Sequence, residues 1–301
     1  QASSGGQDAF VRKYDTAGNE VWTRQFGTSD LDTVHGISVD SSAVYVAGTT
    51  FGTFPSQVSS GDSDAFVRKY DTNGNEIWTR QFGTSSVDFM RSVFVDSSGV
   101  YGGGWTFGTF PGQSSAGGFD AFIRKYDSSG NEVWTRQFGS SSSEFDFAIA
   151  ADGVGVYVGG STEGALPSQV NSGGQDVYVR KYDTNGNEIW TRQFGTALFD
   201  FAVDVGLDST GVYVAGGSEG ALPGQTNQGD FDAFVRKYDA SGNVVWTSQF
   251  GTALFDEVLG ASVGSGRVYV AGSTDGTFSN QVNSGGTDAF VAKLIQDSDG
   301  D

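Results

Sequence analysis

The chain has 301 residues with a formal net charge of −19, and it contains no cysteine. A field this acidic repels phosphate backbones, so nucleic acid is not an expected partner. The absence of cysteine excludes disulfides and thiolate metal sites. No apolar run is long enough for a membrane-spanning helix, so membrane insertion is not expected. The 46 glycines and 14% aromatic residues suit many short strands joined by tight turns.

A 20-residue stretch, DAFVRKYDTNGNEIWTRQFG at 64–83, is repeated along the chain. Nearly the same residues begin again at Asp8, Asp120, Asp176 and Asp232, and the first half returns at Asp288. The spacing between successive copies is always 56 residues. A fixed period of this length indicates a repeat architecture.

Each 56-residue unit contains four segments rich in β-branched and aromatic residues and bounded by turn residues, which predicts four strands. In the unit 28–83 they are Gly36–Val39, Val44–Gly48, Ala65–Tyr70 and Glu76–Phe82. Asn73-Gly74 supplies the turn of a hairpin between the last two. Four antiparallel strands per repeat predict an all-β fold, a β-propeller with one four-stranded blade per unit. The repeated tryptophans, one per unit, are expected to pack between blades.

Counting the strands gives a ring of five blades with one third strand to spare. The strand around Trp22 is predicted to complete the last blade, so that strands from both chain ends close the ring. The spare strand is either Ala9–Tyr14 or Ala289–Leu294. The sequence thus predicts a single propeller domain over residues 1–294 and an acidic linker or tail over residues 295–301.

One acidic column lies four residues before each innermost strand, where carboxylates would surround the mouth of the central channel. Five carboxylates in a ring could bind a cation, with Ca²⁺ as the candidate ion, or a cationic ligand; no other cofactor is predicted. The alternative is that each carboxylate caps backbone N–H groups of its own blade. The column consists of Asp32, Asp88, Glu144, Asp200 and Asp256.

The units differ most where the chain enters the innermost strand, and internal repetition makes these differences visible. If these positions line the channel mouth, they form an asymmetric ligand pocket. The alternative is drift at tolerant loop positions. The predicted ligand-binding residues are His35, Arg91, Asp146, Asp204 and Glu257.

No catalytic motif is present: the chain has one histidine, and it lacks a G-x-S-x-G elbow and a phosphate-binding loop. No catalytic residues are therefore predicted, and the chain is not expected to be an enzyme. A carboxylate pair for polysaccharide hydrolysis or lysis stays open, because its spacing is not visible in a sequence.

The long loops between second and third strands repeat as well, and their apolar residues are expected to tuck the loop onto the blade. If these loops are exposed, they predict five near-equal pockets between blades, as in a multivalent carbohydrate-binding propeller. The apolar loop residues are Phe54, Phe110, Leu166, Leu222 and Phe278.

The segments DAFVRKYD, GNEIWTRQFG, VDSSAVYVAG and EGALPGQTNQGDFDAF resemble the bacterial and archaeal β-propeller repeats called SBBP repeats, over about residues 1–294. The resemblance implies a propeller in a secreted or cell-surface protein, and it implies no catalytic residues. We therefore expect a monomeric, non-enzymatic extracellular interaction or scaffold module whose partner is a protein or a glycan.

Overall fold

The computed structural model describes residues 3–264 and 267–295; the side chains of residues 146, 147 and 295 lie outside this description. Within these ranges the regular structure consists of strands, which form six antiparallel sheets. The described residues contain no helix of the length and apolarity that a membrane crossing requires. The predicted acidic tail at 296–301 lies outside the described residues.

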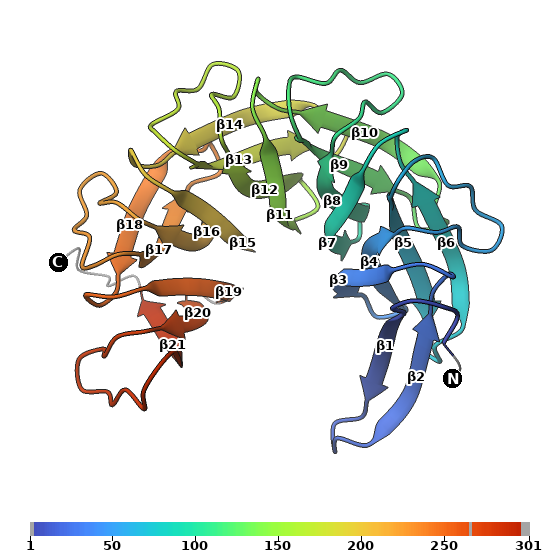
Figure 1. The fold of residues 1–301 in the computed structure, drawn as a ribbon, viewed down its shortest axis with the longest axis horizontal. Coiled ribbons are helices and arrows are strands. Elements are labelled where there is room, and N and C mark those ends of the chain that lie inside the picture. The colour runs from blue at the N-terminus through green and yellow to red at the C-terminus, as the bar shows by residue number, and fades with distance from the viewer. Residues whose placement is uncertain (1–2, 265–266, 296–301) are drawn as a thin grey trace. The chain divides into compact units, whose positions relative to one another are not determined.

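The chain divides into two compact units, residues 1–139 and 140–301. The first unit contains a two-stranded sheet and two four-stranded sheets (Figure 1). In chain order its strands are β1 (Ala9–Tyr14) and β2 (Glu20–Phe26); β3 (Asp32–Val39), β4 (Ala43–Thr50), β5 (Asp64–Asp71) and β6 (Glu76–Phe82); and β7 (Asp88–Asp96), β8 (Gly99–Thr106), β9 (Asp120–Tyr126) and β10 (Glu132–Phe138).

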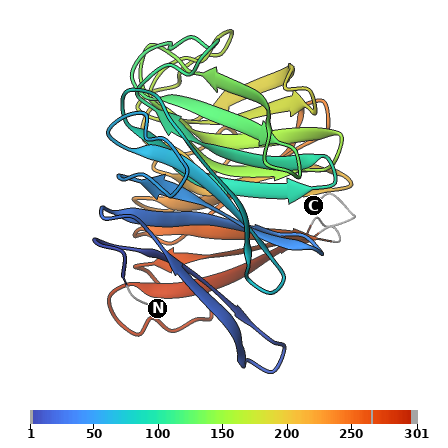
Figure 2. The same cartoon turned by 90° about the vertical axis from the view of Figure 1, so that its right-hand side faces the viewer.

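The second unit contains two four-stranded sheets and a three-stranded sheet. The strands of each sheet run side by side, and loops connect them at the two ends (Figure 2). In chain order they are β11 (Glu144–Ala151), β12 (Gly155–Thr162), β13 (Asp176–Asp183) and β14 (Glu188–Phe194); β15 (Asp200–Asp208), β16 (Gly211–Ser218), β17 (Asp232–Tyr238) and β18 (Val244–Phe250); and β19 (Asp256–Gly264), β20 (Arg267–Thr274) and β21 (Asp288–Ile295).

Local chemistry explains the hairpins that recur in these sheets. Gly74 adopts a φ of 78°, which the turn between β5 and β6 requires and which glycine adopts without strain. The side chain of Asp71 accepts hydrogen bonds from the backbone N–H groups of Asn73 and Asn75, both at 2.8 Å. This side-chain turn fixes the hairpin, so the predicted four-strand repeat and its turn are confirmed.

The two sheets at the chain ends are shorter than the others. β2 pairs with β1, with Lys13 opposite Trp22, in the register that β5 and β6 use for Lys69 and Trp78. The C-terminal sheet ends at β21, and both of the third strands between which the sequence left a choice are formed. The described residues form six sheets, so the count of five blades is not confirmed. The single domain over residues 1–294 stays a prediction.

Within each unit, neighbouring sheets are joined by cationic and indole donors on one sheet and a hairpin turn on the next. Trp78 Nε1 and Lys69 Nζ donate to the carbonyl of Ser128 at 3.3 and 3.0 Å, and Arg80 Nε donates to Gly130 O at 2.6 Å. In the second unit, Trp190 and Lys181 make the same contacts with Ala240 O. Trp78 and Trp190 are buried in these joints, as predicted, whereas Trp246 is only half-buried.

Candidate functional site

The predicted acidic column is buried, and its carboxylates bind their own loops. Asp88 Oδ2 accepts hydrogen bonds from Thr84 N at 2.6 Å and from Thr84 Oγ1 at 3.0 Å. Asp32, Asp200 and Asp256 hold Thr28, Thr196 and Thr252 in the same way, and Glu144 holds Ser140. In the described residues no three His, Cys, Asp or Glu side chains gather as a metal site. The contacts are those of loop caps; cation binding by this column stays a prediction.

A second acidic column was missed by sequence reasoning. It is the aspartate that opens each DAF motif, as at Asp64, which accepts hydrogen bonds from Ser60 N at 3.0 Å and Gln81 Nε2 at 2.7 Å. A β-carbon at Gly83 would overlap Asp64 Oδ1 and lie 2.8 Å from Asp88 Oδ2, so the two carboxylates flank this glycine. The signal was available, because this aspartate occurs in all six copies.

These paired carboxylates influence each other. Burial raises the pKa of Asp88 above its ordinary value, and the nearby charge of Asp64 adds to that rise. Burial likewise raises the pKa of Asp200 beside Asp176. In the described residues, buried oxygens of several of these side chains have no hydrogen-bond partner, among them Asp88 Oδ1 and Asp176 Oδ1. Burial therefore makes loss of the proton from Asp88 and from Asp200 less favourable in the folded state than in water.

The predicted channel-mouth residues lie in both units. In the first, Arg91 Nη1 lies 3.4 Å from His35 Nδ1, and Thr33 Oγ1 lies 3.1 Å from His35 Nε2. Burial lowers the pKa of His35, and the positive charge of Arg91 lowers it further. The structure thus brings His35 and Arg91 together, with Arg91 also 5.5 Å from the ring centre of Trp105.

In the second unit, Asp204 fastens two strands together. Its Oδ2 accepts a hydrogen bond from Ala261 N on β19 at 2.8 Å, and burial raises its pKa. Glu257 Oε1 accepts a hydrogen bond from Ser273 Oγ at 3.1 Å. The side chain of Asp146 lies outside the described part of the structure. A shared pocket of these residues stays a prediction.

A glutamine in the fourth strand of every complete sheet fills a slot formed by the loop between the second and third strands. Gln81 Oε1 accepts a hydrogen bond from Phe54 N at 2.9 Å, and Gln81 N donates to Gln57 Oε1 at 3.0 Å. Gln81 Nε2 donates to Gly52 O at 2.8 Å and to Asp64 Oδ2. We call this arrangement the glutamine slot. It recurs around Gln137, Gln193 and Gln249.

The apolar loop residues support this slot. Phe54, Phe110, Leu166 and Leu222 are buried, so the loops are tucked onto their sheets as expected. Phe278 in the last sheet is only half-buried. This difference follows from the lack of a fourth strand beside β21, because the strand that would cover the loop is not part of the sheet.

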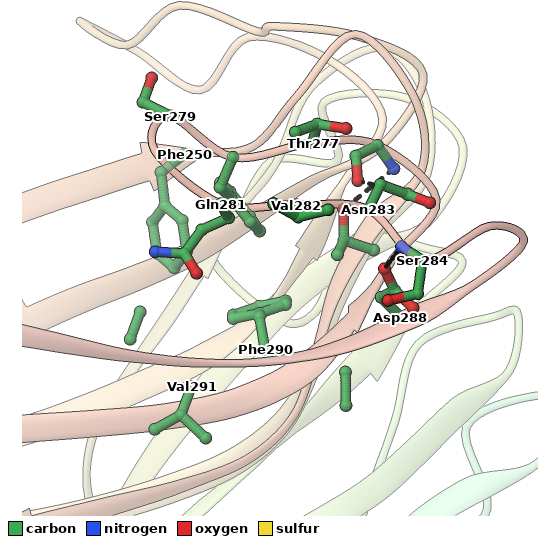
Figure 3. A pocket seen from close by; sticks show the side chains of 15 residues that line it. Phe250, Thr277, Ser279, Gln281, Val282, Asn283, Ser284, Asp288, Phe290 and Val291 are labelled. Atoms are coloured by element: carbon green, nitrogen blue, oxygen red, sulfur yellow. Dashed lines mark hydrogen bonds between the residues drawn. The ribbon is translucent and has the colours of Figure 1, made fainter.

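In the last sheet the glutamine slot is an open pocket of about 550 Å³. Its lining contains the equivalents of all four slot groups: Gly276, Phe278, Gln281 and Asp288. In Figure 3 the side chain of Gln281 extends from the loop toward the strand that carries Phe290. Within residues 267–295, neither the Phe278 amide nor the Gln281 side chain has a hydrogen-bond partner. This pocket is the candidate functional site.

Comparison with known proteins gives a distant relative and a fold. No protein-family model matches the chain. It is 28% identical to the regulatory protein FlaEY of Caulobacter vibrioides, over 80% of this chain and 30% of that protein's length. The WD40 domain of Neurospora crassa Pan2 superposes with a TM-score of 0.51 at 13% identity, over 87% of this chain and 66% of that one. A Trypanosoma rangeli sialidase gives a TM-score of 0.44 at 10% identity, over 90% and 49%.

The WD40 match shows the fold alone: an all-β, β-propeller-like fold built from antiparallel sheets. The chain spans about 30% of the length of the relative that it matches.

Proposed function

We propose that the chain is a non-enzymatic interaction or scaffold module of the β-propeller type that works outside the cell, in a secreted or cell-surface protein. The observation that carries this proposal is the open glutamine slot of the last sheet. It presents to solvent the groups that bind a strand in each complete sheet. The acidic composition and the resemblance to SBBP repeats support the extracellular setting. The regulatory name of the distant relative supports a binding role.

A turnover assay tests the non-enzymatic part of this proposal. The chain is incubated with a panel of plant, fungal and bacterial polysaccharides, and released reducing ends and unsaturated products are measured. We expect no release above a heat-treated control. Release that disappears in the Asp204→Asn, Glu257→Gln double variant would overturn the proposal in favour of a hydrolase or lyase.

A carbohydrate-binding module is the second candidate. A pocket of about 690 Å³ in the second unit is lined by Trp190, Arg192, Gln169 and Glu188, a mixture of aromatic and polar groups. The groups are built from repeated positions, so a glycan bound there is expected at several equivalent places. Titration calorimetry after a glycan-array screen tests this candidate. A stoichiometry of several glycans per chain supports it, and a stoichiometry of one or none contradicts it.

The closed monomeric ring of five blades stays the finer sequence-based prediction. It requires β2 to leave β1 and to pair with β21. In the register of β5 and β6, Arg68 lies opposite Thr79, so Ala292 would lie opposite Thr23. The pairing would separate Arg12 from Glu20, which lie 3.5 Å apart. The chain has no cysteine of its own, so a disulfide between Thr23→Cys and Ala292→Cys within one chain would support the closure.

A further inference from the structure

We propose that the C-terminal sheet, β19 to β21, accepts an extended strand from another polypeptide that carries the same kind of repeat. The inference rests on the proposed role as an interaction module and names its partner. In each four-stranded sheet the third strand pairs on both sides, as β17 does with β16 and β18. In the described residues β21 pairs with β20 alone. Its other edge therefore has backbone groups free for an added strand.

The slot beside this edge is selective for glutamine. In the preceding sheet, Gln249 uses its side-chain oxygen, its side-chain nitrogen and its backbone N–H at once, on Leu222 N, Gly220 O and Gln225 Oε1. Glutamate would bring a second negative charge beside Asp288, and asparagine is one methylene too short. A glutamine side chain therefore fixes the position of an incoming strand along β21.

A second contact fixes the register of the incoming strand. Trp246 in β18 lies 6.0 Å from Tyr213 between ring centres, and Trp190 lies at the same distance from Tyr157. The equivalent of these tyrosines in the last sheet is Tyr269, whose ring is exposed. A tryptophan three residues before the glutamine of the incoming strand would cover Tyr269 as the slot is filled.

The last sheet also differs from the others at the position that contacts the glutamate of the fourth strand. In the second unit, Arg180 of β13 binds the fourth strand through Glu188, at 3.5 Å, and Thr191, at 2.8 Å. β21 has Ala292 at this position. A glutamate in the incoming strand would therefore approach the acidic protein without a cation to bind it. The favoured pattern is that of β18, which has Val244 in place of the glutamate.

This preference decides the source of the strand. β2, β6, β10 and β14 all begin with glutamate. β18 is itself the fourth strand of a complete sheet. The described strands of this chain thus offer no free segment of the favoured pattern, and the occupant comes from another polypeptide with an apolar residue two positions before its tryptophan.

A labelled peptide with the sequence of residues 241–252, SGNVVWTSQFGT, tests the proposal by fluorescence anisotropy with the full chain. We expect saturable binding that weakens about tenfold or more when the peptide carries Gln249→Ala, because the slot hydrogen bonds are lost. The protein variant Gln281→Ala is expected to weaken binding similarly. Gln225→Ala, the equivalent change in the complete preceding sheet, is expected to leave binding unchanged, and thermal melts of both variants check folding.

The peptide of residues 73–84, which carries Glu76, is expected to bind more weakly, and the protein variant Ala292→Arg is expected to reverse the order of the two peptides. The proposal would be overturned if the Gln281→Ala variant bound the peptide as tightly as the parent protein does, or if the parent protein did not bind the peptide. A disulfide within one chain in the Thr23→Cys, Ala292→Cys variant would also overturn it, because β2 would then occupy the slot. Turnover of a polysaccharide would instead overturn the non-enzymatic function and leave the strand-binding result standing.

Discussion

The second unit contains two sheets of similar sequence with different surroundings, β15 to β18 and β19 to β21. Val235 in β17 is fully buried, whereas the equivalent Val291 in β21 is 77% exposed. Both strands begin with Asp-Ala-Phe-Val. The sequence of such a strand is therefore suited to a buried position between other strands and sheets. Whether its side chains are buried depends on the presence of those neighbouring strands and sheets.

The largest expected effect comes from the tryptophans of this unit. Trp190 is buried and donates its indole N–H to Ala240 O at 3.2 Å. Trp246 is half-buried, and its Nε1 has no partner in the described residues. Urea unfolding is expected to show that Trp190→Ala lowers the free energy of unfolding by about 3 to 5 kcal/mol. Trp246→Ala is expected to cost about 2 kcal/mol less, because less packing and no hydrogen bond are removed. Equal losses would mean that the last sheet is covered in solution.

A smaller effect separates the two valines. Val235→Thr places a hydroxyl in a fully buried position and is expected to cost about 1 to 3 kcal/mol of unfolding free energy. Val291→Thr changes an exposed side chain and is expected to stay within about 0.5 kcal/mol of the parent. Urea titrations of the two variants measure this contrast. A large cost at Val291 would contradict the exposed face and would indicate a partner there.

The paired carboxylates predict a pH dependence. The pKa values of Asp88, Asp200 and Asp232 are raised in the folded state, so this state binds protons more tightly than the unfolded chain. Their contribution to stability is therefore present at low pH and is lost as the pH rises through the raised values. The melting temperature is therefore expected to be higher at pH 5 than at pH 7.

The variant Asp88→Asn provides the test of that assignment, because it removes one titrating group and keeps the shape of the side chain. Its melting temperature is expected to change less between pH 5 and pH 7 than that of the parent. Asp71→Asn serves as the matched control, because hydrogen bonds from Asn75 lower the pKa of Asp71. An unchanged pH profile in Asp88→Asn would contradict a role for this pair.

The smallest effect is expected from calcium. Asp32 and Asp88 each have one carboxylate oxygen bound to a threonine N–H and hydroxyl. Addition of millimolar Ca²⁺ after EDTA is therefore expected to leave the melting temperature within about 1 °C. A clear upward shift would contradict a purely capping role and support the predicted metal site.

The repeat sequence predicted the local fold well because each unit carries the same signals. The turn at Asp71 to Asn75 and the position of Trp78 could be predicted, since each depends on residues close in sequence or on one repeated contact. The pairing of the strands near the two chain ends could not be predicted. β1 and β21 have the sequence of third strands, and a repeat pattern does not specify which fourth strand pairs with which.

The candidate site was missed for a related reason. Gln81 and Gln57 were visible as repeated residues, but their hydrogen bonds join segments 24 positions apart, and a period does not show which columns touch. The acidic column that contains Asp88 could be predicted because one carboxylate precedes each innermost strand. Its partner column at Asp64 directly precedes the predicted third strand, Ala65–Tyr70, and its contact with Gln81 joins segments 17 positions apart, which the repeat period does not show.

The joints between sheets have a consequence for how such chains can change. Their acceptors are main-chain carbonyls, supplied by Thr72, Ser128 and Ala240 in different joints. The donors therefore depend on the backbone conformation of the turn, and the side chains of the turn can vary. A whole repeat that is added or removed carries both the donor side chains and the turn carbonyls. The array could therefore change in length by one repeat at a time and keep the same contacts between neighbouring sheets.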